Sequence, residues 1–214
     1  MARTAGSDGE RTEAAIREAA AQLIARHGFE AVTMRQLAAE VGVQAAALYR
    51  YFPSKEDLLF KLMRDHMNGL AEALEAALPA HGDPRARLEA FIANHVRFHV
   101  ERRHATHVSN MELRSLSRDH LSEILRLRSA YEKELRAILR DGQDAGVFAV
   151  DDVALTSMAI IQMITGVIVW FRPDDRLSIE DVTTKYQTMT MRLAGALAAE
   201  EKRHVPPLHE IRAR

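Results

Sequence analysis

The sequence predicts an all-α protein of about nine helices, and two observations support that prediction. Apolar side chains recur every three or four residues along most of the 214 residues, and no stretch alternates between apolar and polar residues as a half-buried strand does. No internal repeat is present. The expected helices cover residues 11–27, 34–41, 44–51, 54–78, 85–103, 107–115, 119–144, 151–171 and 178–201.

The first four helices are bounded by residues that begin or end helices for physical reasons. Gly28 and Gly42 can adopt the left-handed conformation that ends a helix. Thr33 can cap the helix that follows it, and Ser54 can cap the long helix after it. Pro53 ends the short third helix, because proline disfavours helical geometry in the residue before it.

The two ends and the middle of the chain read as non-helical. Residues 1–10 are small and polar, so we expect a mobile N-terminal arm. Residues 202–214 include two adjacent prolines and predict a flexible tail. The segment Pro79–Pro84 is the clearest linker.

Composition excludes several classes of protein. The net charge is −1, so any binding to nucleic acid must come from local placement of charge. The chain has no cysteine, which removes disulfide scaffolds and thiol catalysis and favours a cytoplasmic location. The first residues have no apolar core, so we expect no signal peptide. The run Met158–Phe171 is too short to span a bilayer, and we expect no membrane association.

The N-terminal helices carry a recognisable motif. Two short helices that meet at Gly42, after one bracing helix, form a helix-turn-helix pattern. The segment Thr33–Leu59, TMRQLAAEVGVQAAALYRYFPSKEDLL, resembles the DNA-binding domain of the TetR family of bacterial transcriptional regulators. The similarity extends from Arg11 to Leu70. It implies a helix-turn-helix DNA-binding domain at 11–56 and a larger helical ligand-binding and dimerisation domain at 57–201, with helix 57–78 as the connector.

The motif assigns DNA contacts to specific residues. Arg35 can reach a phosphate or a guanine edge, and Gln44 can pair with adenine. The resemblance places Tyr49 and Lys55 at phosphate contacts, while the alanines that follow Gln44 leave little capacity for direct base readout. The expected DNA-binding residues are Thr33, Arg35, Gln44, Ala45, Ala46, Tyr49, Arg50, Tyr51 and Lys55.

One feature of the N-terminal segment opposes DNA binding. Residues 1–53 contain six arginines, no lysine and six acids, so the segment is neutral. The acids must therefore lie away from the DNA, or binding will be weak and strongly dependent on salt.

The resemblance also implies a homodimer that binds a palindromic operator and a small-molecule effector. The last two helices are the expected dimer surface, where Ala159, Gly166, Ala194, Gly195, Ala196 and Ala198 would allow close approach, although ordinary core packing gives the same pattern. Effector pockets are mostly apolar with a few polar groups. The candidate residues, whose spacing equally suits plain core, are Phe91, His95, Phe98, His99, Asn110, Met111, Arg114, Tyr131, Met163 and Trp170.

Charge and a second motif suggest the class of effector. Between Pro84 and Arg140, lysine and arginine outnumber the acids by twelve to seven. This excess suits an anionic ligand, or it is a solvated helix face. The segment Trp170–Ser178, WFRPDDRLS, resembles a motif in a TetR branch that senses acyl-CoA thioesters, so the expected effector is an acyl-CoA. His95 and His99, four residues apart, are an alternative metal pair, although we expect neither a metal nor any other bound cofactor.

No catalytic motif is present, so we expect a regulator and not an enzyme. The expected function is repression that a ligand relieves. The alternative is a helical protein-interaction adaptor that kept the helix-turn-helix scaffold without binding DNA.

Overall fold

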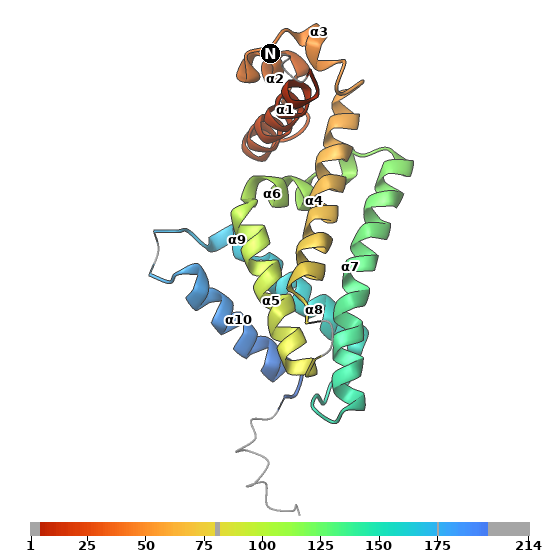
Figure 1. Cartoon of the computed structure of the whole chain (residues 1–214), viewed down its shortest axis with the longest axis vertical. Coiled ribbons are helices and arrows are strands. Elements are labelled where there is room, and N and C mark those ends of the chain that lie inside the picture. Colours follow the sequence, from red (N-terminus) through yellow and green to blue (C-terminus); the bar gives the residue numbers. More distant parts are fainter. Residues whose placement is uncertain (1–4, 80–81, 175, 197–214) are drawn as a thin grey trace, which may run out of the picture. The chain divides into compact units, whose positions relative to one another are not determined.

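The predicted all-α class is confirmed by the structure, a computed structural model that describes residues 5–79, 82–174 and 176–196. Within these residues the chain forms ten α-helices and one 3₁₀ turn, η1, with no strand (Figure 1). The helices are α1 (Ala5–His27), α2 (Met34–Val41), α3 (Ala45–Leu48), α4 (Lys55–Ala77), α5 (Pro84–Glu101), α6 (Arg103–Met111), α7 (Arg118–Asp144), α8 (Val153–Thr165), α9 (Val167–Trp170) and α10 (Ile179–Leu193), with η1 at Leu113–Ser115.

Contacts divide the chain into two compact units. Unit 1 comprises residues 1–73 and 98–131, and unit 2 comprises residues 74–97 and 132–214. This division by contacts falls within α4, α5 and α7, and the DNA-binding domain predicted at 11–56 lies wholly in unit 1. The physical reason is that Val108 of α6, Leu116 after η1 and Ile124 of α7 belong to the same apolar core as the N-terminal helices.

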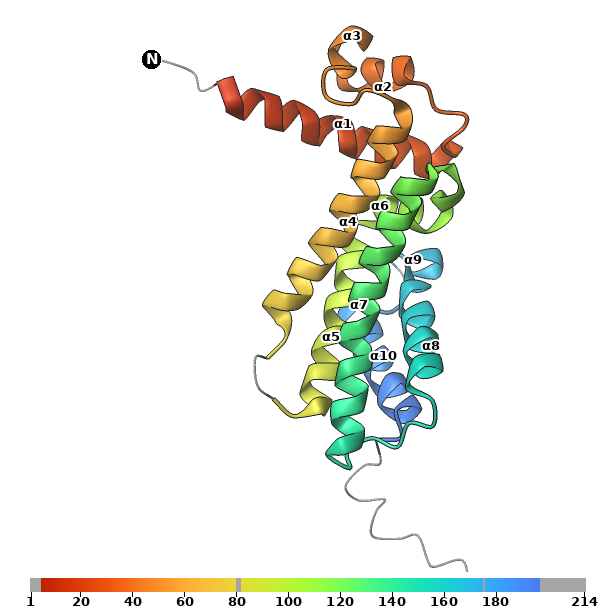
Figure 2. The same cartoon turned by 90° about the vertical axis from the view of Figure 1, so that its right-hand side faces the viewer.

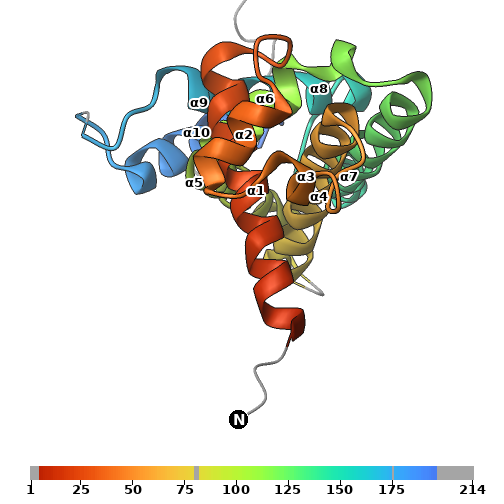
Figure 3. The same cartoon turned by 90° about the horizontal axis from the view of Figure 1, so that it is seen from above.

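The core of unit 1 holds the two short helices in place. Leu37 of α2, Leu48 of α3 and Phe52 after it are almost fully buried against Ile16 and Ile24 of α1. Figure 3 looks down on these helices. Burial of these side chains orients α2 and α3, since neither helix is long enough to be stable alone.

Local signals at the start and end of α2 are confirmed. Thr33 forms a capping box with Gln36, in which each residue satisfies a backbone N–H group of the other. Gly42 ends α2 in the left-handed conformation, with φ of 74°, and Gly28 does the same after α1, with φ of 82°. Ser54 accepts a hydrogen bond from Asp57 N at 2.9 Å and so caps α4.

The third helix is shorter than predicted. Helix α3 stops at Leu48, and residues 49–51 form a turn instead of extending to Tyr51. The backbone N–H groups of Arg50 and Tyr51 bond carbonyls three residues back, to Ala47 and Leu48, instead of four. Pro53 favours this tightening, because it restricts the residue before it.

Several other helix boundaries differ from the prediction. Helix α1 begins at Ala5, so most of the expected arm at 1–10 is helical. The helix expected at 107–115 begins at Arg103 and ends at Met111, and a 3₁₀ turn covers its last residues. The expected tail at 202–214 lies outside the described residues.

Unit 2 is a bundle of helices. Figure 2 shows the unit 2 parts of α5 and α7 beside α8 and α10. The helix predicted at 151–171 is interrupted at Gly166, where Val169 N bonds Gly166 O in a turn and α9 begins. Helix α10 ends at Leu193, well before the predicted Glu201, because Gly195 turns into the left-handed conformation and Ala149 N bonds Ala194 O at 2.9 Å.

Candidate nucleic-acid interface and effector site

The helix-turn-helix presents one polar face to solvent. Arg35, Gln44, Ala46, Tyr49 and Arg50 are all exposed, and Tyr49 is 50% exposed although its aromatic ring is large. None of the four polar side chains in this set bonds another described residue. These side chains are therefore free to contact DNA, while Leu37 and Leu48 on the opposite side of the same helices are buried.

Four of the expected DNA contacts are less available. The Thr33 hydroxyl is used in its cap, where it accepts from Gln36 N and donates to Gln36 Oε1 at 2.8 Å. Ala45 and Tyr51 are half-buried, and Tyr51 packs against the unit 1 core. The fourth residue is Lys55.

Lys55 has a structural role that the sequence did not indicate. Its Nζ atom donates to Phe29 O at 2.9 Å and lies 4.1 Å from the centre of the Phe29 ring. The ammonium group thus joins the start of α4 to the loop after α1. A phosphate contact by Lys55 would have to share this ammonium group with the carbonyl.

Polar links join helices of unit 1 that are distant in sequence. Arg17 of α1 donates to Asp65 of α4 at 2.7 Å, and Lys61 of α4 pairs with Glu13 of α1. Glu112, between α6 and η1, accepts from Phe29 N at 3.1 Å. These links fix the helices that carry α2 and α3.

A further link joins α4 to α7. Glu56 accepts from Ser117 N at 2.8 Å and pairs with His120 Nδ1 at 2.8 Å. Together with Asp57, these side chains form a cluster whose candidate ligand atoms lie within 4.8 Å of one another. Because Glu56 is engaged by α7 and Asp57 by the Ser54 cap, we assign the cluster to anchoring of α4 and not to a metal.

The ten expected effector residues are divided between the two units. In unit 1, Phe98, His99 and Tyr131 are buried, Asn110 is half-buried, and Met111 and Arg114 are exposed. In unit 2, Phe91 is buried and stacks on His95, whose Nε2 atom lies 2.9 Å from Thr165 Oγ1. The hydroxyl group of Thr165 thus engages one of the two histidines in the alternative metal pair.

The last two candidates in unit 2 differ in burial. Met163 is half-buried on α8, whereas Trp170 is 47% exposed and packs edge-on against Phe171.

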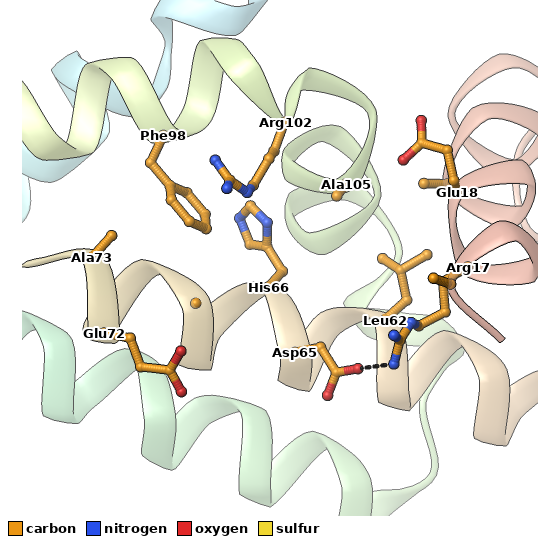
Figure 4. A pocket seen from close by; sticks show the side chains of 13 residues that line it. Arg17, Glu18, Leu62, Asp65, His66, Glu72, Ala73, Phe98, Arg102 and Ala105 are labelled. Atoms are coloured by element: carbon orange, nitrogen blue, oxygen red, sulfur yellow. Dashed lines mark hydrogen bonds and ion pairs between the residues drawn. The ribbon is translucent and has the colours of Figure 1, made fainter. Parts of the chain in front are cut away.

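A groove of about 600 Å³ lies within unit 1 and contains only one of the expected effector residues, Phe98 (Figure 4). Helices α1, α4 and α6, with the end of α5, form its walls. Of the two polar groups beside Phe98, Arg102 belongs to the arginine-rich stretch that predicts an anionic ligand, whereas His66 is absent from the predicted binding residues. The available signal for His66 was its position, because it falls at the same helical spacing as the leucines of α4 that face the core. The lining residues are Ala14, Arg17, Glu18, Ala21, Leu62, Asp65, His66, Gly69, Glu72, Ala73, Phe98, Arg102 and Ala105.

His66 is an uncharged histidine at neutral pH. Its side chain is 6% exposed, and its ring lies 5.2 Å from the Phe98 ring and 5.6 Å from the His99 ring, centre to centre. Burial, and next the positive charges of His99, Arg102 and Arg128, lower the pKa of His66 from 6.5 to about 3.

Unit 2 exposes large apolar side chains on its last helices. The small residues expected at the dimer surface are in part used within the unit, because Ala194 is buried and Gly195 packs on Ala149. The segment Val153–Trp170 is long and apolar enough to cross a membrane, by length and composition alone, and 28% of it is buried. The large apolar residues exposed on α8, α9 and α10 are Leu155, Met158, Val169, Trp170, Met189 and Leu193.

Two family profiles match the chain. The profile described as "Bacterial regulatory proteins, tetR family" matches residues 16–62, and "Tetracyclin repressor-like, C-terminal domain" matches residues 81–194. The HTH-type transcriptional repressor KstR2 of Rhodococcus jostii is 25% identical over 190 residues, which are 88% of this chain and 92% of KstR2.

Solved structures share the fold. PfmR, a TetR family transcriptional regulator from Thermus thermophilus, is 37% identical with a TM-score of 0.77, over 83% of this chain and 97% of PfmR. AibR, solved in complex with isovaleryl coenzyme A and operator DNA, has a TM-score of 0.77 at 24% identity, over 87% of this chain and 100% of AibR.

Proposed function

The chain belongs to the TetR family of bacterial regulatory proteins and is a ligand-responsive, DNA-binding transcriptional repressor; we propose that it acts as a cytoplasmic homodimer and that an acyl-CoA thioester releases it from a palindromic operator. The observation that carries the proposal is the exposed face of α2 and α3. Polar side chains on this face are free, while the apolar side chains behind them are fixed in the core. The family consists of regulators, and we propose no catalytic activity.

The DNA contacts follow from exposure. Arg35 and Arg50 are the cations of the helix-turn-helix face, and Gln44 and Tyr49 supply a base contact and a phosphate contact. The segment is neutral overall, so few phosphates are neutralised in each half-site. Affinity therefore depends on two half-sites that are bound together by a symmetric dimer.

The exposed apolar face of α8, α9 and α10 supports the dimer. Several large apolar side chains are exposed on these helices, and exposed apolar surface of this kind often marks an interaction site. Covering Leu155, Met158 and Met189 with the same surface of a second copy would remove them from solvent. A second copy is favoured over a membrane because α8 and α9 are interrupted at Gly166 and unit 2 also buries part of the segment.

The segment Trp170–Ser178 supports an acyl-CoA effector. In the structure it connects α9 to α10: Arg172 donates to Phe171 O at 2.9 Å, and Ser178 caps α10. An effector that prefers the state unable to bind DNA shifts the population by about 1.4 kcal/mol for each tenfold preference. The helices shared by both units, α4, α5 and α7, are the route by which we propose that this change reaches α2 and α3.

The test is a fluorescence-anisotropy titration of the full chain against its own upstream DNA at two salt concentrations. Isovaleryl-CoA, hexanoyl-CoA and free coenzyme A are each added to the complex. We expect salt-sensitive binding that at least one thioester abolishes and free coenzyme A does not. Binding that no thioester changes would retain the repressor and reject the effector. Absence of binding at both salt concentrations would favour the interaction adaptor.

Variants locate the interface. Arg50→Ala and Arg35→Ala should each reduce the slope of log affinity against log salt by about one, the loss of one phosphate contact. Arg126→Ala, an exposed arginine on α7, is the control and should bind as the unmodified protein does. Equal loss in all three variants would contradict the assignment. Tyr49→Phe is preferred to any change at Lys55, because Lys55 also holds the loop after α1.

A further inference from the structure

Three buried polar atoms without a partner lie on residues of unit 1, two of which, Ser109 and Arg128, are in contact. Six buried side-chain nitrogen or oxygen atoms in the described chain accept or donate no hydrogen bond, and His66 Nδ1, Ser109 Oγ and Arg128 Nε are three of them. Arg128 reaches Ser109, since its guanidinium donates to Ser109 O at 2.6 Å. Buried polar atoms are nearly always satisfied in proteins, so a cluster of such atoms indicates a missing partner.

The charge at this place is positive and uncompensated. Arg128 is half-buried, and its protein contacts are the neutral oxygens of Ser109 and Asn110, the latter at 3.2 Å. No carboxylate of the described residues lies within 4.0 Å of it, and burial lowers its pKa. A guanidinium that leaves water without an anion is costly, and a bidentate carboxylate or phosphate offsets that cost.

Arg102 and His99 lie beside His66 and Phe98. Arg102 lies 4.1 Å from the centre of the Phe98 ring, and the buried His99 ring packs edge-on against His66. The charges of both residues, and that of Arg128, act on the His66 imidazole. His66 therefore stays neutral and keeps an unused Nδ1 atom, while the charge that a ligand would meet comes from the two arginines.

The groove between α1, α4 and α6 opens beside these groups. His66, Phe98 and Arg102 line this groove, so a ligand can reach them from solvent (Figure 4), and the charge of Arg128 acts on His66 from outside the lining. The acids on its walls do not neutralise the cluster: Asp65 is paired with Arg17, and Glu18 and Glu72 are exposed to water. Arg102 pairs with Glu101 at 3.0 Å on the surface, a weak link that a ligand can replace.

We propose that an anionic small molecule, carrying a carboxylate or a phosphate, binds in unit 1 at His66, Arg102 and Arg128, with its uncharged part in the adjoining groove. The ligand would contact α1 and α4 directly, the two helices whose polar links fix the helix-turn-helix. Binding of the anion does not depend on the proposed function. A change in DNA affinity caused by the bound anion would rest on the proposed function.

Isothermal titration calorimetry with the full chain tests binding. The probes are sodium hexanoate, inorganic phosphate and hexanoyl-CoA, with hexanamide as the uncharged match to hexanoate. We expect at least one anion to bind about tenfold more tightly than hexanamide, the difference that one charge-assisted contact supplies. Hexanoate alone would identify a carboxylate ligand, and phosphate or hexanoyl-CoA alone a phosphorylated one. No anion binding better than hexanamide would overturn the proposal.

Three variants assign the site. Arg128→Met should weaken the bound anion about tenfold or more, and Arg102→Met about threefold to tenfold. Arg126→Met removes an exposed arginine from the same helix and should change affinity by less than about twofold. If Arg128→Met fails to fold, the exposed Arg102 decides the test. Equal effects of Arg102→Met and Arg126→Met would overturn the site.

A spectroscopic readout separates binding here from binding elsewhere. A bound anion offsets the positive charges around His66, so it should raise the pKa of His66 from about 3. Histidine ¹⁵N–¹H NMR titrations, with the His66 signal assigned by His66→Gln, measure this shift with and without the saturating anion. An unchanged titration would place the ligand elsewhere. Absence of DNA binding by the ligand-free protein in anisotropy would count against the proposed operator and leave these binding results intact.

Discussion

Units 1 and 2 differ in the apolar surface that they expose. In unit 1, residues far apart in sequence are joined by polar links such as Arg17 to Asp65 and Glu56 to His120. Unit 2 also has such links, for example Arg87 to Asp141 and His95 to Thr165, but most of the large apolar side chains exposed in the described chain lie there. The difference agrees with our proposal that a second copy covers this surface of unit 2.

The largest expected effect lies in the tight packing of unit 2. An alanine at Gly142, on α7, would place its Cβ atom 1.9 Å from Phe148 Cδ2. Gly142→Ala should therefore destabilise the protein by about 3 kcal/mol, the upper end of the cost of overpacking. Urea unfolding followed by far-ultraviolet circular dichroism measures it.

The matched control is a helix glycine of unit 1. Gly69→Ala meets Phe98 at 3.4 Å, an ordinary contact, and should be neutral or stabilise by up to about 1 kcal/mol through helix propensity. If Gly142→Ala unfolds at the same urea concentration as the unmodified protein, Phe148 moves aside without cost. The claim of tight packing in unit 2 would then be wrong.

The next largest effect concerns the exposed apolar side chains of unit 2. Leu155 on α8 and Met111 at the end of α6 are both 61% exposed, but only Leu155 belongs to the proposed dimer face. Leu155→Glu should weaken dimerisation about a hundredfold, or about 2.7 kcal/mol, because it places a charge in an apolar interface. Met111→Glu should have no effect. Sedimentation velocity over a concentration series measures both, and dissociation by Met111→Glu would contradict the comparison.

The buried histidine of unit 1 predicts a loss of stability in acid. Unfolded His66 takes up a proton near pH 6.5, whereas the folded pKa is about 3, so the stability that its neutral form contributes is present above pH 6.5. Between pH 7 and pH 5 this group should account for a loss of about 2 kcal/mol. Urea unfolding at the two pH values should show that His66→Gln loses less stability than the unmodified protein. His104→Gln, an exposed histidine, is the control; equal losses in both variants would show that His66 is not responsible.

The smallest effect compares one ion pair from each unit. Asp65→Asn removes the partner of Arg17 in unit 1, and Asp141→Asn removes the partner of Arg87 in unit 2, at 2.7 and 2.8 Å. Asp141 is the more exposed acid, so water already screens its pair. We expect about 1 kcal/mol for Asp65→Asn and about 0.3 kcal/mol for Asp141→Asn by urea unfolding. A larger cost at Asp141 would reverse the view that unit 1 depends on polar links.

Signals within a few residues predicted most of the fold. Thr33, Gly42 and Ser54 act through their own backbone and the next turn, so the neighbouring residues in the sequence are enough to predict their roles. Periodicity placed α4 and α7 within one or two residues. The break at Gly166 was missed, because an apolar run gives no sign of where a buried helix is interrupted.

Features that depend on distant contacts could not be predicted. The division within α4, α5 and α7 depends on where α6 packs, which no local pattern specifies. The role of Lys55 requires the carbonyl of Phe29, and the cluster at Arg128 requires α6 to lie beside α7. The DNA and effector contacts themselves remain predictions. The structure contributes which of those residues are exposed and which are already engaged.

The exposed indole on α9 makes the assembly of unit 2 optically visible. Trp170 is the single tryptophan of the chain and lies on the apolar face of α8, α9 and α10, 47% exposed. Its emission therefore originates from that face alone, red-shifted in water and blue-shifted once a second copy covers it. Diluting the unlabelled protein while recording the emission maximum would follow the monomer–dimer equilibrium with no probe added.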